Sequence, residues 1–210
     1  MVTVLSLKYN APKNFDMEII PVSKDPEWGV ISPFNLGPCR TRDGTLFFNM
    51  ENLWQYSKVY PQHIEHDNNL LAGEIKAEWY AWHMEGARTR KGIRYPFGKG
   101  ADTPHFSKWG DLRLSYVSAR KQIYVPEYAK LLIVNTKFKK LLRDYNRGAH
   151  IVIRDYDTYD ALKVYAHNGT HNHPFLQALN NPDLKFGHGF VVAMALMLDK
   201  NPRWFEQWVI

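Results

Sequence analysis

The stretch that most constrains the fold is MENLWQYSKVY, which covers residues 50–60 between Asn49 and Pro61. Asn is a preferred residue just before a helix and Pro interrupts one, so the sequence predicts a helix over Met50–Tyr60. Apolar and aromatic side chains cover most of the circumference of this helix, and a helix of that kind is normally buried. We therefore expect it to lie inside the protein.

Three polar residues interrupt this apolar surface. Glu51, Gln55 and Lys58 are spaced i, i+4 and i+7, which places all three on one face of a helix. On a buried helix we expect such a stripe to face a cavity. The alternative is a solvated face, which is the commoner position of Glu and Lys. Against it, a rise of about 10 Å over seven residues separates Glu51 and Lys58 too far for a simple ion pair.

The rest of the sequence predicts mainly helices. Short strands are expected at Thr3–Leu7, Glu18–Val22 and His150–Arg154, and these can form one small sheet. The helices expected from apolar periodicity and from Gly and Pro boundaries are Gly73–Thr89, Gly110–Gln122, Glu127–Tyr145, Thr158–Ala166, Pro174–Asn180 and Phe190–Asp199, with Pro202 opening a last one. Pro126 precedes the third of these, and its ring suits a first helical turn.

A loop over Gly92–Ser107 is longer than a connection needs, and such loops are often functional. The chain has 210 residues, of which 45% are hydrophobic, which is enough for one core. We expect a single compact domain over residues 1–210, mainly α with a small β-sheet.

Charge and cysteine content narrow the class of protein. The formal net charge of +6 favours an anionic partner such as a nucleotide, a phosphosugar or a nucleic acid, although many basic proteins have no specific partner. The single cysteine, Cys39, excludes an internal disulfide framework and a multi-cysteine metal site. The sequence contains neither a signal-peptide pattern nor an apolar run of about 18 residues, so we expect a cytoplasmic protein without a membrane span.

Motifs before the predicted helix extend the pattern. Ser32-Pro33-Phe34-Asn35 is followed by Pro38, by an Asp43-Gly44 turn, and then by the stripe. This order resembles the NADAR (YbiA-like) family of N-glycosidases, in which Glu-x-x-x-Gln-x-x-Lys lies on a helix behind a Ser-Asn-Phe-like turn, a proline and an Asp-Gly turn. Weaker likenesses follow at Gly86, Arg88 and Arg90, at Trp109 as the opening of the next helix, and at the acidic pair Asp155 and Asp160.

The likeness covers residues 32–197, so residues 1–30 are expected to be an addition to the family's domain. Two positions depart from the family. Ala161-Leu162 stands where Trp-Gly tends to follow the acidic residue, and Gly187-His188-Gly189-Phe190 stands where the family has Gly-x-Asn-x-Leu-Gly. These departures bear on the substrate more than on the chemistry. The resemblance implies a hydrolase that needs no cofactor and acts on ADP-ribose joined to a guanine base or on a ribosylamino-pyrimidine phosphate.

Breaking an N-glycosidic bond develops oxocarbenium character on the ribose, which a carboxylate stabilises while an acid assists the leaving base. Glu51 suits the carboxylate or general-base role, and Gln55 suits a positioning role. Lys58 can donate a proton, hold a phosphate, or form a Schiff base with an opened ribose. Asp155 and Asp160 are candidates for a second carboxylate, with strand-end and helix-capping roles as the alternative.

Other residues are candidates for substrate binding. Phe34, Asn35 and Trp109 suit stacking on and hydrogen bonding to a nucleobase, although aromatic residues more often fill a core. Arg88 is a candidate phosphate ligand, and so are three further cations that flank the long loop, Arg90, Arg94 and Lys99. A solvated basic surface is the simpler account of these cations.

Three rival functions remain open. The first is a non-catalytic nucleotide or nucleic-acid binding protein that uses the basic loop and exposed aromatic residues. The second is transfer of the glycosyl group to another acceptor in place of water. The third is a metal-dependent hydrolase built on His167, His171 and His173, which lack a nearby glutamate that would complete a known motif.

Overall fold

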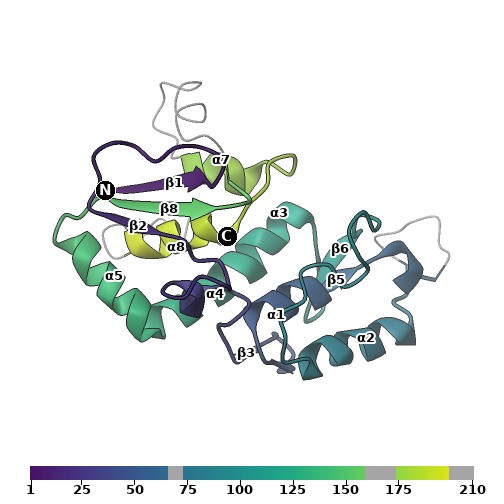
Figure 1. Ribbon diagram of the computed structural model, residues 1–210. Coiled ribbons are helices and arrows are strands. Elements are labelled where there is room, and N and C mark those ends of the chain that lie inside the picture. The colour runs from purple at the N-terminus through teal and green to yellow at the C-terminus, as the bar shows by residue number, and fades with distance from the viewer. Residues whose placement is uncertain (66–72, 159–173, 199–210) are drawn as a thin grey trace. The chain divides into compact units, whose positions relative to one another are not determined.

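The computed structural model describes residues 1–65, 73–158 and 174–198, and it divides the chain into two compact units (Figure 1). Unit 1 comprises Met1–Ser32 and Tyr128–Ile210, and unit 2 comprises Pro33–Glu127. Each unit contains β-sheet and helices of its own. The predicted helices at Thr158–Ala166 and after Pro202 lie outside the described residues, apart from Thr158.

Unit 1 is built on a three-stranded sheet in which β8 (Ile151–Asp155) lies between β1 (Val2–Ser6) and β2 (Met17–Ile19). Both outer strands run parallel to β8, with Val4 and Ile19 opposite Ile153. Every residue of β8 is buried, as expected for the central strand of a parallel sheet. The three predicted strands and their single sheet are confirmed.

The first 30 residues are an integral part of this sheet, because they supply both of its outer strands. Arg154 of β8 fastens them further. Its guanidinium donates to the Glu18 carboxylate at 2.7 Å and to the carbonyl oxygens of Leu7 at 3.2 Å and Tyr9 at 2.5 Å. The segment that leaves β1 is thus tied to the central strand by a largely buried cation.

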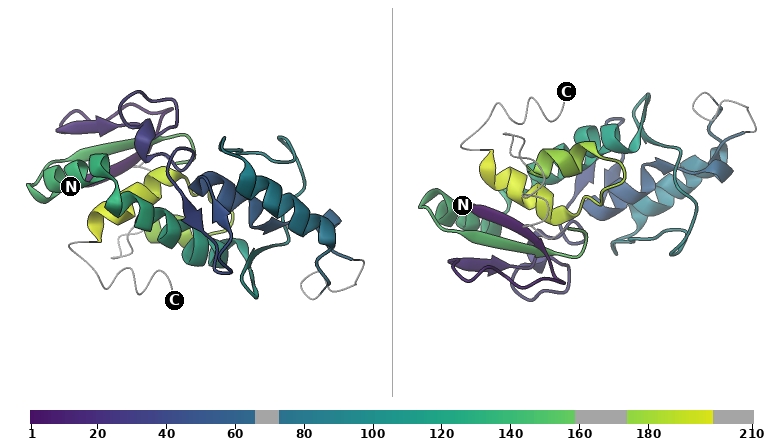
Figure 2. Two further views of the ribbon diagram at one scale, coloured as in Figure 1. Left: turned by 90° about the horizontal axis from the view of Figure 1, so that it is seen from below. Right: turned by 90° about the horizontal axis from the view of Figure 1, so that it is seen from above.

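Helices complete unit 1. The amphipathic helix α5 (Thr136–Asn146) buries Phe138, Leu141 and Tyr145, and α8 (His188–Met197) packs on β8 and β1 (Figures 1 and 2). The described part of this unit also contains the short η1 (Gly29–Ile31) and α7 (Pro174–Asn180). The prediction for Pro174–Asn180 is confirmed, and α8 begins two residues before the predicted Phe190.

Unit 2 contains two small antiparallel sheets. In the first, β3 (Cys39–Arg40) pairs with β4 (Leu46–Phe47) across the Asp43-Gly44 turn. In the second, β6 (Phe106–Trp109) lies between β5 (Lys58–Val59) and β7 (Leu112–Leu114). The helical elements in the described part of this unit include α1 (Met50–Tyr56), η2 (Pro61–His63), α2 (Ala77–Arg88), α3 (Tyr116–Ala119) and the π-helical η3 (Arg120–Tyr124).

The predicted helix Gly110–Gln122 is wrong in its first half. Gly110 has φ +60° and makes the tight turn between β6 and β7, and Leu112 and Leu114 alternate with Arg113 in the period of a strand. Helix α3 begins only after Ser115, whose hydroxyl oxygen accepts from the Ser118 N–H. Pairing with β6 therefore decides the conformation of residues 112–114.

The predicted helix Glu127–Tyr145 is two helices, because Asn135 caps α5 and separates it from α4 (Val125–Val134), which runs across the boundary between the units. Pro126 does not open a helix, since α4 continues directly from η3. The Val125 N–H donates to the Arg120 carbonyl, five residues earlier, at the end of this π-helical turn. A widened turn of this kind accommodates a proline, which lacks an N–H and crowds the preceding turn.

The fold class is therefore mixed α/β. Helices are the larger part, as predicted, but the expected mainly α architecture with one small sheet understates the strands, because unit 2 adds two further sheets to that of unit 1. The additional strands are two to four residues long, and tertiary pairing selects them.

Candidate functional site

Helix α1 carries the predicted stripe and is held rigidly at its N-terminus. The Asn49 side chain accepts from the Asn52 N–H at 2.8 Å, the Met50 N–H donates to the Leu36 carbonyl, and the Glu51 N–H donates to the Pro33 carbonyl, the last two at 2.9 Å. These bonds occupy N–H groups that a free helix end leaves unsatisfied. They also attach the turn at Pro33–Asn35 directly to the first turn of the helix.

The three stripe residues form a continuous hydrogen-bonded chain. The Gln55 amide nitrogen donates to a Glu51 carboxylate oxygen at 2.8 Å, and the Lys58 amine donates to the Gln55 amide oxygen at 2.7 Å. Glu51 is 5% exposed and Gln55 8% exposed, so two members are buried. The solvated-face alternative is therefore wrong for Glu51 and Gln55.

Lys58 does not lie on the helix, so this part of the prediction is wrong. Helix α1 ends at Tyr56, and Lys58 and Val59 form β5 because they pair with Ser107 and Phe106 of β6. The Ser57 hydroxyl donates to the Trp54 carbonyl at 3.0 Å and so occupies a backbone acceptor of the last turn. Lys58 still reaches Gln55, so the chain survives the change from helix to strand.

The amine of Lys58 is chemically perturbed. Desolvation lowers the pKa of Lys58 to about 8, and the negative charge of Glu51 opposes this shift. The ammonium group also lies 5.0 Å from the ring centroid of Trp54, on which Tyr124 packs at 4.9 Å. With a pKa of about 8, roughly a tenth of the lysine is a neutral amine at pH 7. The same group can thus act as an acid and, in its minor form, as a nucleophile.

Phe34 and Asn35 belong to the turn that is bonded to α1. Phe34 is half-buried and lies against Gly92, where a β-carbon would come within 2.7 Å of its ring. Asn35 is exposed. The structure thus brings the aromatic and amide candidates to the N-terminal end of the helix that carries Glu51.

Two asparagines that we did not predict as site residues hold the basic segment beside α1. Asn52, which is fully buried, donates to the Thr89 and Lys91 carbonyls at 2.8 and 3.0 Å and accepts from the Ile93 N–H at 2.8 Å. Asn49 donates to the Arg90 carbonyl at 3.0 Å. The sequence predicts their position on a buried helix, but it does not indicate their distant backbone partners.

Gly86 and Arg88 of the basic run have separate roles. A β-carbon on Gly86 would lie 2.1 Å from the Tyr56 ring, so glycine permits the close approach of α1 and α2. Arg88 is exposed in the last turn of α2 and is available to an anionic ligand. Because Asn52 fixes the backbone just after α2, Arg88 is held near the N-terminal half of α1.

Trp109 is predicted to open a helix, and this is wrong: it is the last residue of β6, it is 7% exposed, and it pairs with Leu112. Its burial favours the core role over the stacking role. The aromatic rings near the stripe that contact Trp54 are those of Tyr116 and Tyr124. Their centroids lie 6.3 and 4.9 Å from the Trp54 ring centroid.

Asp155 lies in unit 1, at the end of β8, and is 1% exposed. Its carboxylate accepts from the Gly189 N–H at 2.9 Å and from the Tyr156 N–H at 2.6 Å, and it lies 3.6 Å from the His188 ring nitrogen Nε2. A β-carbon on Gly187 would meet the same carboxylate at 2.2 Å. These contacts support the capping alternative for Asp155. Asp160 lies outside the described residues.

Metal binding has no support in the described part of the chain. His167, His171 and His173 lie outside it, and no group of three or more His, Cys, Asp or Glu among residues 1–65, 73–158 and 174–198 is placed to hold an ion. The buried His83 of α2 is held by a contact of 2.8 Å between its Nδ1 and the Tyr56 carbonyl and stacks on Trp79 at 4.7 Å. His83 therefore has a structural role in the packing of α2 against the end of α1.

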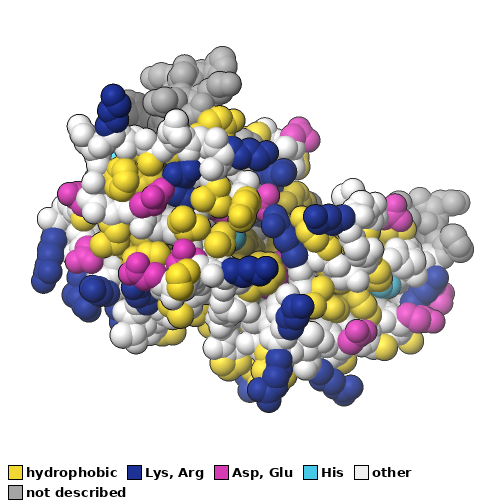
Figure 3. Space-filling model, viewed as in Figure 1, with side chains coloured by type: hydrophobic (Ala, Val, Ile, Leu, Met, Phe, Trp, Pro, Cys, Tyr) yellow, Lys and Arg dark blue, Asp and Glu magenta, His cyan; other side chains and the backbone are white. Residues whose placement is uncertain are grey.

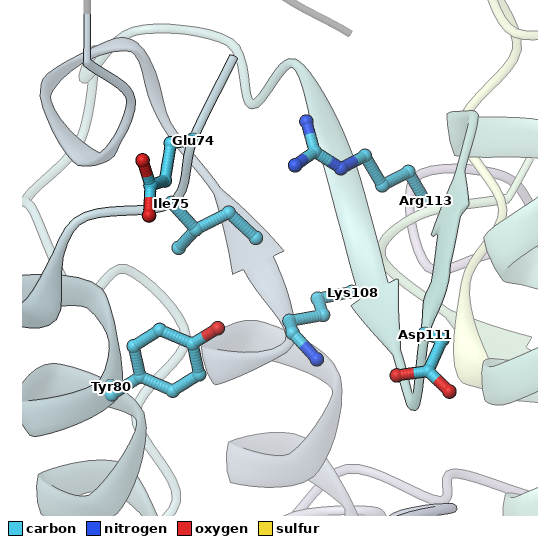
Figure 4. Close-up of a pocket in the computed structure, with 6 residues that line it drawn as sticks. All are labelled: Glu74, Ile75, Tyr80, Lys108, Asp111 and Arg113. Carbon is cyan, nitrogen blue, oxygen red and sulfur yellow. The ribbon is translucent and has the colours of Figure 1, made fainter. Parts of the chain in front are cut away.

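Unit 2 also contains a cavity of about 360 Å³ between the start of α2 and the β6–β7 hairpin (Figure 4). Its lining residues are Glu74, Ile75, Tyr80, Lys108, Asp111 and Arg113. In Figure 4 the side chains of Tyr80, Lys108 and Asp111 point toward a common space. The predicted site residues are not among those that line it, so this cavity is distinct from the Glu51–Gln55–Lys58 chain.

Comparison of the chain with protein-family models, with curated proteins and with solved structures finds no match. The resemblance to the NADAR family therefore stays a prediction that depends on the quoted motifs. Among the described helices, none is long and apolar enough to cross a membrane.

Proposed function

We propose that the protein is an N-glycosidase that hydrolyses the bond between a base nitrogen and C1 of a ribose. The observation that carries the proposal is the hydrogen-bonded chain from Glu51 through Gln55 to Lys58, with its first two members buried. A buried carboxylate and a partly desolvated amine linked by one amide supply the two functions that this reaction needs, charge stabilisation and proton donation.

In the hydrolytic route, the Glu51 carboxylate stabilises positive charge on the ribose while the Lys58 ammonium donates a proton to the departing base. Water then attacks C1 and gives a proton to Glu51, which returns it to Lys58 through solvent, so the proton balance closes. Gln55 holds the two side chains in place, with its amide nitrogen toward the acid and its oxygen toward the amine. At neutral pH most Lys58 carries the proton that this route requires, because its pKa is about 8.

The substrate we favour is ADP-ribose linked to a guanine base, with a ribosylamino-pyrimidine phosphate as the second choice. Both carry phosphate groups, which agrees with the net charge of +6 and with the exposed Arg88 beside α1. Transfer of the ribosyl group to an acceptor other than water uses the same residues and is a variant of the same proposal.

The test is incubation with ADP-ribosylated guanosine and with a ribosylamino-pyrimidine phosphate, followed by chromatography of the released base and sugar. We expect release by the wild-type protein and none by Glu51→Gln, which keeps the size and a hydrogen-bonding group of the side chain. Glu85→Gln, an exposed position on α2, is the matched control and is expected to remain active. Absence of product from a panel of nucleosides and nucleotides would contradict the proposal.

A second candidate function is non-catalytic binding of nucleic acid. Residues 86–101 contain five Lys or Arg residues and no Asp or Glu, and Asn49 and Asn52 fix the backbone of this segment. This candidate predicts salt-dependent binding without turnover.

A further inference from the structure

The cavity between the start of α2 and the β6–β7 hairpin is lined by charges of both signs, and we refer to it as the hairpin cavity (Figure 4). Two of its lining residues are acids, two are cations, one is aromatic and one is aliphatic: Glu74, Asp111, Lys108, Arg113, Tyr80 and Ile75. Its volume of about 360 Å³ is within the range of small-molecule sites. None of these residues belongs to the Glu51–Gln55–Lys58 chain.

The two cations of the hairpin cavity lie directly opposite each other. Lys108 of β6 and Arg113 of β7 are partners in an antiparallel pair, and opposite residues of such a pair project from the same face of a sheet, where like charges repel. The Lys108 amine donates to the Gly110 carbonyl at 2.5 Å, and the Arg113 guanidinium donates to the Gly73 carbonyl at 2.7 Å. Backbone groups thus hold both cations beside the cavity. A carboxylate bound between them would offset their repulsion.

The two acids of the cavity come from separate segments of unit 2. Asp111 lies in the turn of the hairpin, and Glu74 lies before α2, where its carbonyl accepts from the Glu65 N–H at 3.0 Å. In Figure 4 the two carboxylates lie on opposite sides of Lys108. Among the described residues, neither acid forms an ion pair with Lys108. The cavity therefore contains opposite charges that are not joined directly to each other.

The hairpin cavity lies on the face of the β5–β6–β7 sheet opposite to the Lys58 side chain. Lys58 is paired with Ser107, so their side chains share one face, and Lys108, the next residue of β6, projects from the other. Phe106 shares the face of Lys108, and its buried ring lies with its centroid 4.9 Å from the Arg113 guanidinium carbon. A ligand in the cavity is therefore separated by the sheet from the lysine of the proposed reaction.

Two further side chains give the cavity an apolar wall. Tyr80 is 48% exposed, and its ring centroid lies 6.0 Å from the Lys108 amine. Ile75 is partly buried against a core cluster that consists of Val59, Ile64, Trp79 and Phe106. In Figure 4 Tyr80 and Ile75 lie across Lys108 from Asp111. A ligand whose charged groups meet the hairpin can thus place an apolar part on this wall.

We propose that the hairpin cavity binds a free α-amino acid with a large apolar or aromatic side chain. Its carboxylate lies between Lys108 and Arg113, its ammonium group lies at Asp111, and its side chain packs on Tyr80 and Ile75. Figure 3 shows dark blue Lys and Arg side chains on the visible face of both units, so positive charge alone, which a simple anion requires, does not distinguish this cavity. Paired cations, an acid and an exposed ring together do, and a zwitterion with an apolar side chain uses all of them.

The test is isothermal titration calorimetry of the full chain with L-phenylalanine, for which we expect saturable binding. Two analogues each lack one of its charges: 3-phenylpropionate has no ammonium group, and 2-phenylethylamine has no carboxylate. Both are expected to bind at least about tenfold more weakly than L-phenylalanine, because one charged contact is lost. For the same reason, Lys108→Met and Asp111→Asn are each expected to weaken the binding of L-phenylalanine by about tenfold to a hundredfold.

The matched controls are Lys140→Met and Asp102→Asn, which make the same two changes at exposed positions outside the cavity. Both are expected to bind L-phenylalanine like the wild type. Urea unfolding midpoints of all four variants separate a loss of binding from a loss of folding, and if Lys108→Met does not fold, Asp111→Asn still decides. No saturable binding of L-phenylalanine, equal binding of 3-phenylpropionate, or equal effects of the control variants would overturn the proposal.

Glu51→Gln distinguishes this site from that of the proposed reaction. The variant should bind L-phenylalanine like the wild type, because the cavity lies on the other face of the sheet from Lys58. Lost binding in Glu51→Gln would place the amino acid at the Glu51–Gln55–Lys58 chain and overturn the proposal. Binding of L-phenylalanine by a wild type that releases no base would refute the proposed function and leave the cavity assigned.

Discussion

The perturbed amine of Lys58 leads to a prediction about the pH dependence of stability. A pKa of about 8 in the folded protein, against 10.5 for an ordinary lysine, is a difference of about 2.5 units, or about 3 kcal/mol at 1.36 kcal/mol per unit. Because the folded pKa is the lower one, the unfolded chain binds more protons between pH 8 and 10.5. The free energy of unfolding therefore rises with pH in this window. The destabilisation caused by burying the charged Lys58 amine is fully present below pH 8.

The measurement is urea unfolding of the wild type and of Lys58→Met between pH 7 and pH 9.5. The difference in unfolding free energy between the two proteins cancels most other titrating groups, among them Tyr56 and Tyr60, whose pKa values are raised by burial. Over this range we expect the wild type to gain about 2 kcal/mol relative to Lys58→Met. At pH 7 the variant loses the cost of the buried charge but leaves the Gln55 amide oxygen without its donor, so a change of less than about 2 kcal/mol is expected there.

A difference in unfolding free energy between the two proteins that stays constant from pH 7 to pH 9.5 would contradict the prediction. It would mean that the amine is solvated in the folded protein and titrates like an ordinary lysine. Lys58 would then have no lowered pKa to suit it to proton donation near neutral pH, whatever the activity of the protein.

Two further predictions concern the packing that supports the site. Asn52→Leu should destabilise the protein by about 3 kcal/mol or more, because it leaves the Thr89 and Lys91 carbonyls and the Ile93 N–H without their bonds. The control is Asn10→Leu, at an exposed position in unit 1, and equal urea midpoints of the two variants would contradict this prediction. Burial lowers the pKa of His83, so the unfolded state binds the extra proton and the stability that neutral His83 provides is lost as pH falls below about 6.5. His83→Asn, which retains a donor for the Tyr56 carbonyl but does not titrate, should lose less stability than the wild type between pH 7 and pH 5, and equal losses would sink this reading.

The elements that the sequence predicted correctly are those that depend on local pattern. Alternating and β-branched residues located β1, β2 and β8, and Asn49 located the start of α1 because its side chain caps the helix directly. Pro174–Asn180 was also predicted with its observed bounds. In each case the signal and the structure it determines lie within a few residues of one another.

The errors occur where distant partners select the conformation. Residues 57–60 were expected to continue the helix up to Pro61, yet Lys58 and Val59 pair with β6, nearly 50 residues later in the chain. Leu112 and Leu114 become a strand for the same reason. Pro126 was expected to start a helix, but α4 continues from the π-helical turn before it, which accommodates a residue without an N–H. No local sequence signal predicts such a turn.

The candidate site could be predicted in composition but only partly in role. Glu51, Gln55 and Lys58 are brought together as expected, and Phe34 and Asn35 lie at the same end of α1. The contribution of Asn52 depends on backbone groups about 40 residues away, which spacing along one helix does not indicate. The Asp155 carboxylate accepts from the Gly189 N–H at the start of α8 in unit 1. Its close approach to this helix end requires glycine at position 187, where a β-carbon would meet the carboxylate.

Whether Glu51 and Lys58 act on C1 of a ribose can be seen in a crystal structure of the protein with bound ADP-ribose. We expect C1 of the terminal ribose to lie about 3 to 3.5 Å from a Glu51 carboxylate oxygen, with the Lys58 amine on the side from which the base departs. ADP-ribose bound in the cavity lined by Tyr80, Lys108 and Asp111, with the Glu51–Gln55–Lys58 chain unoccupied, would contradict it.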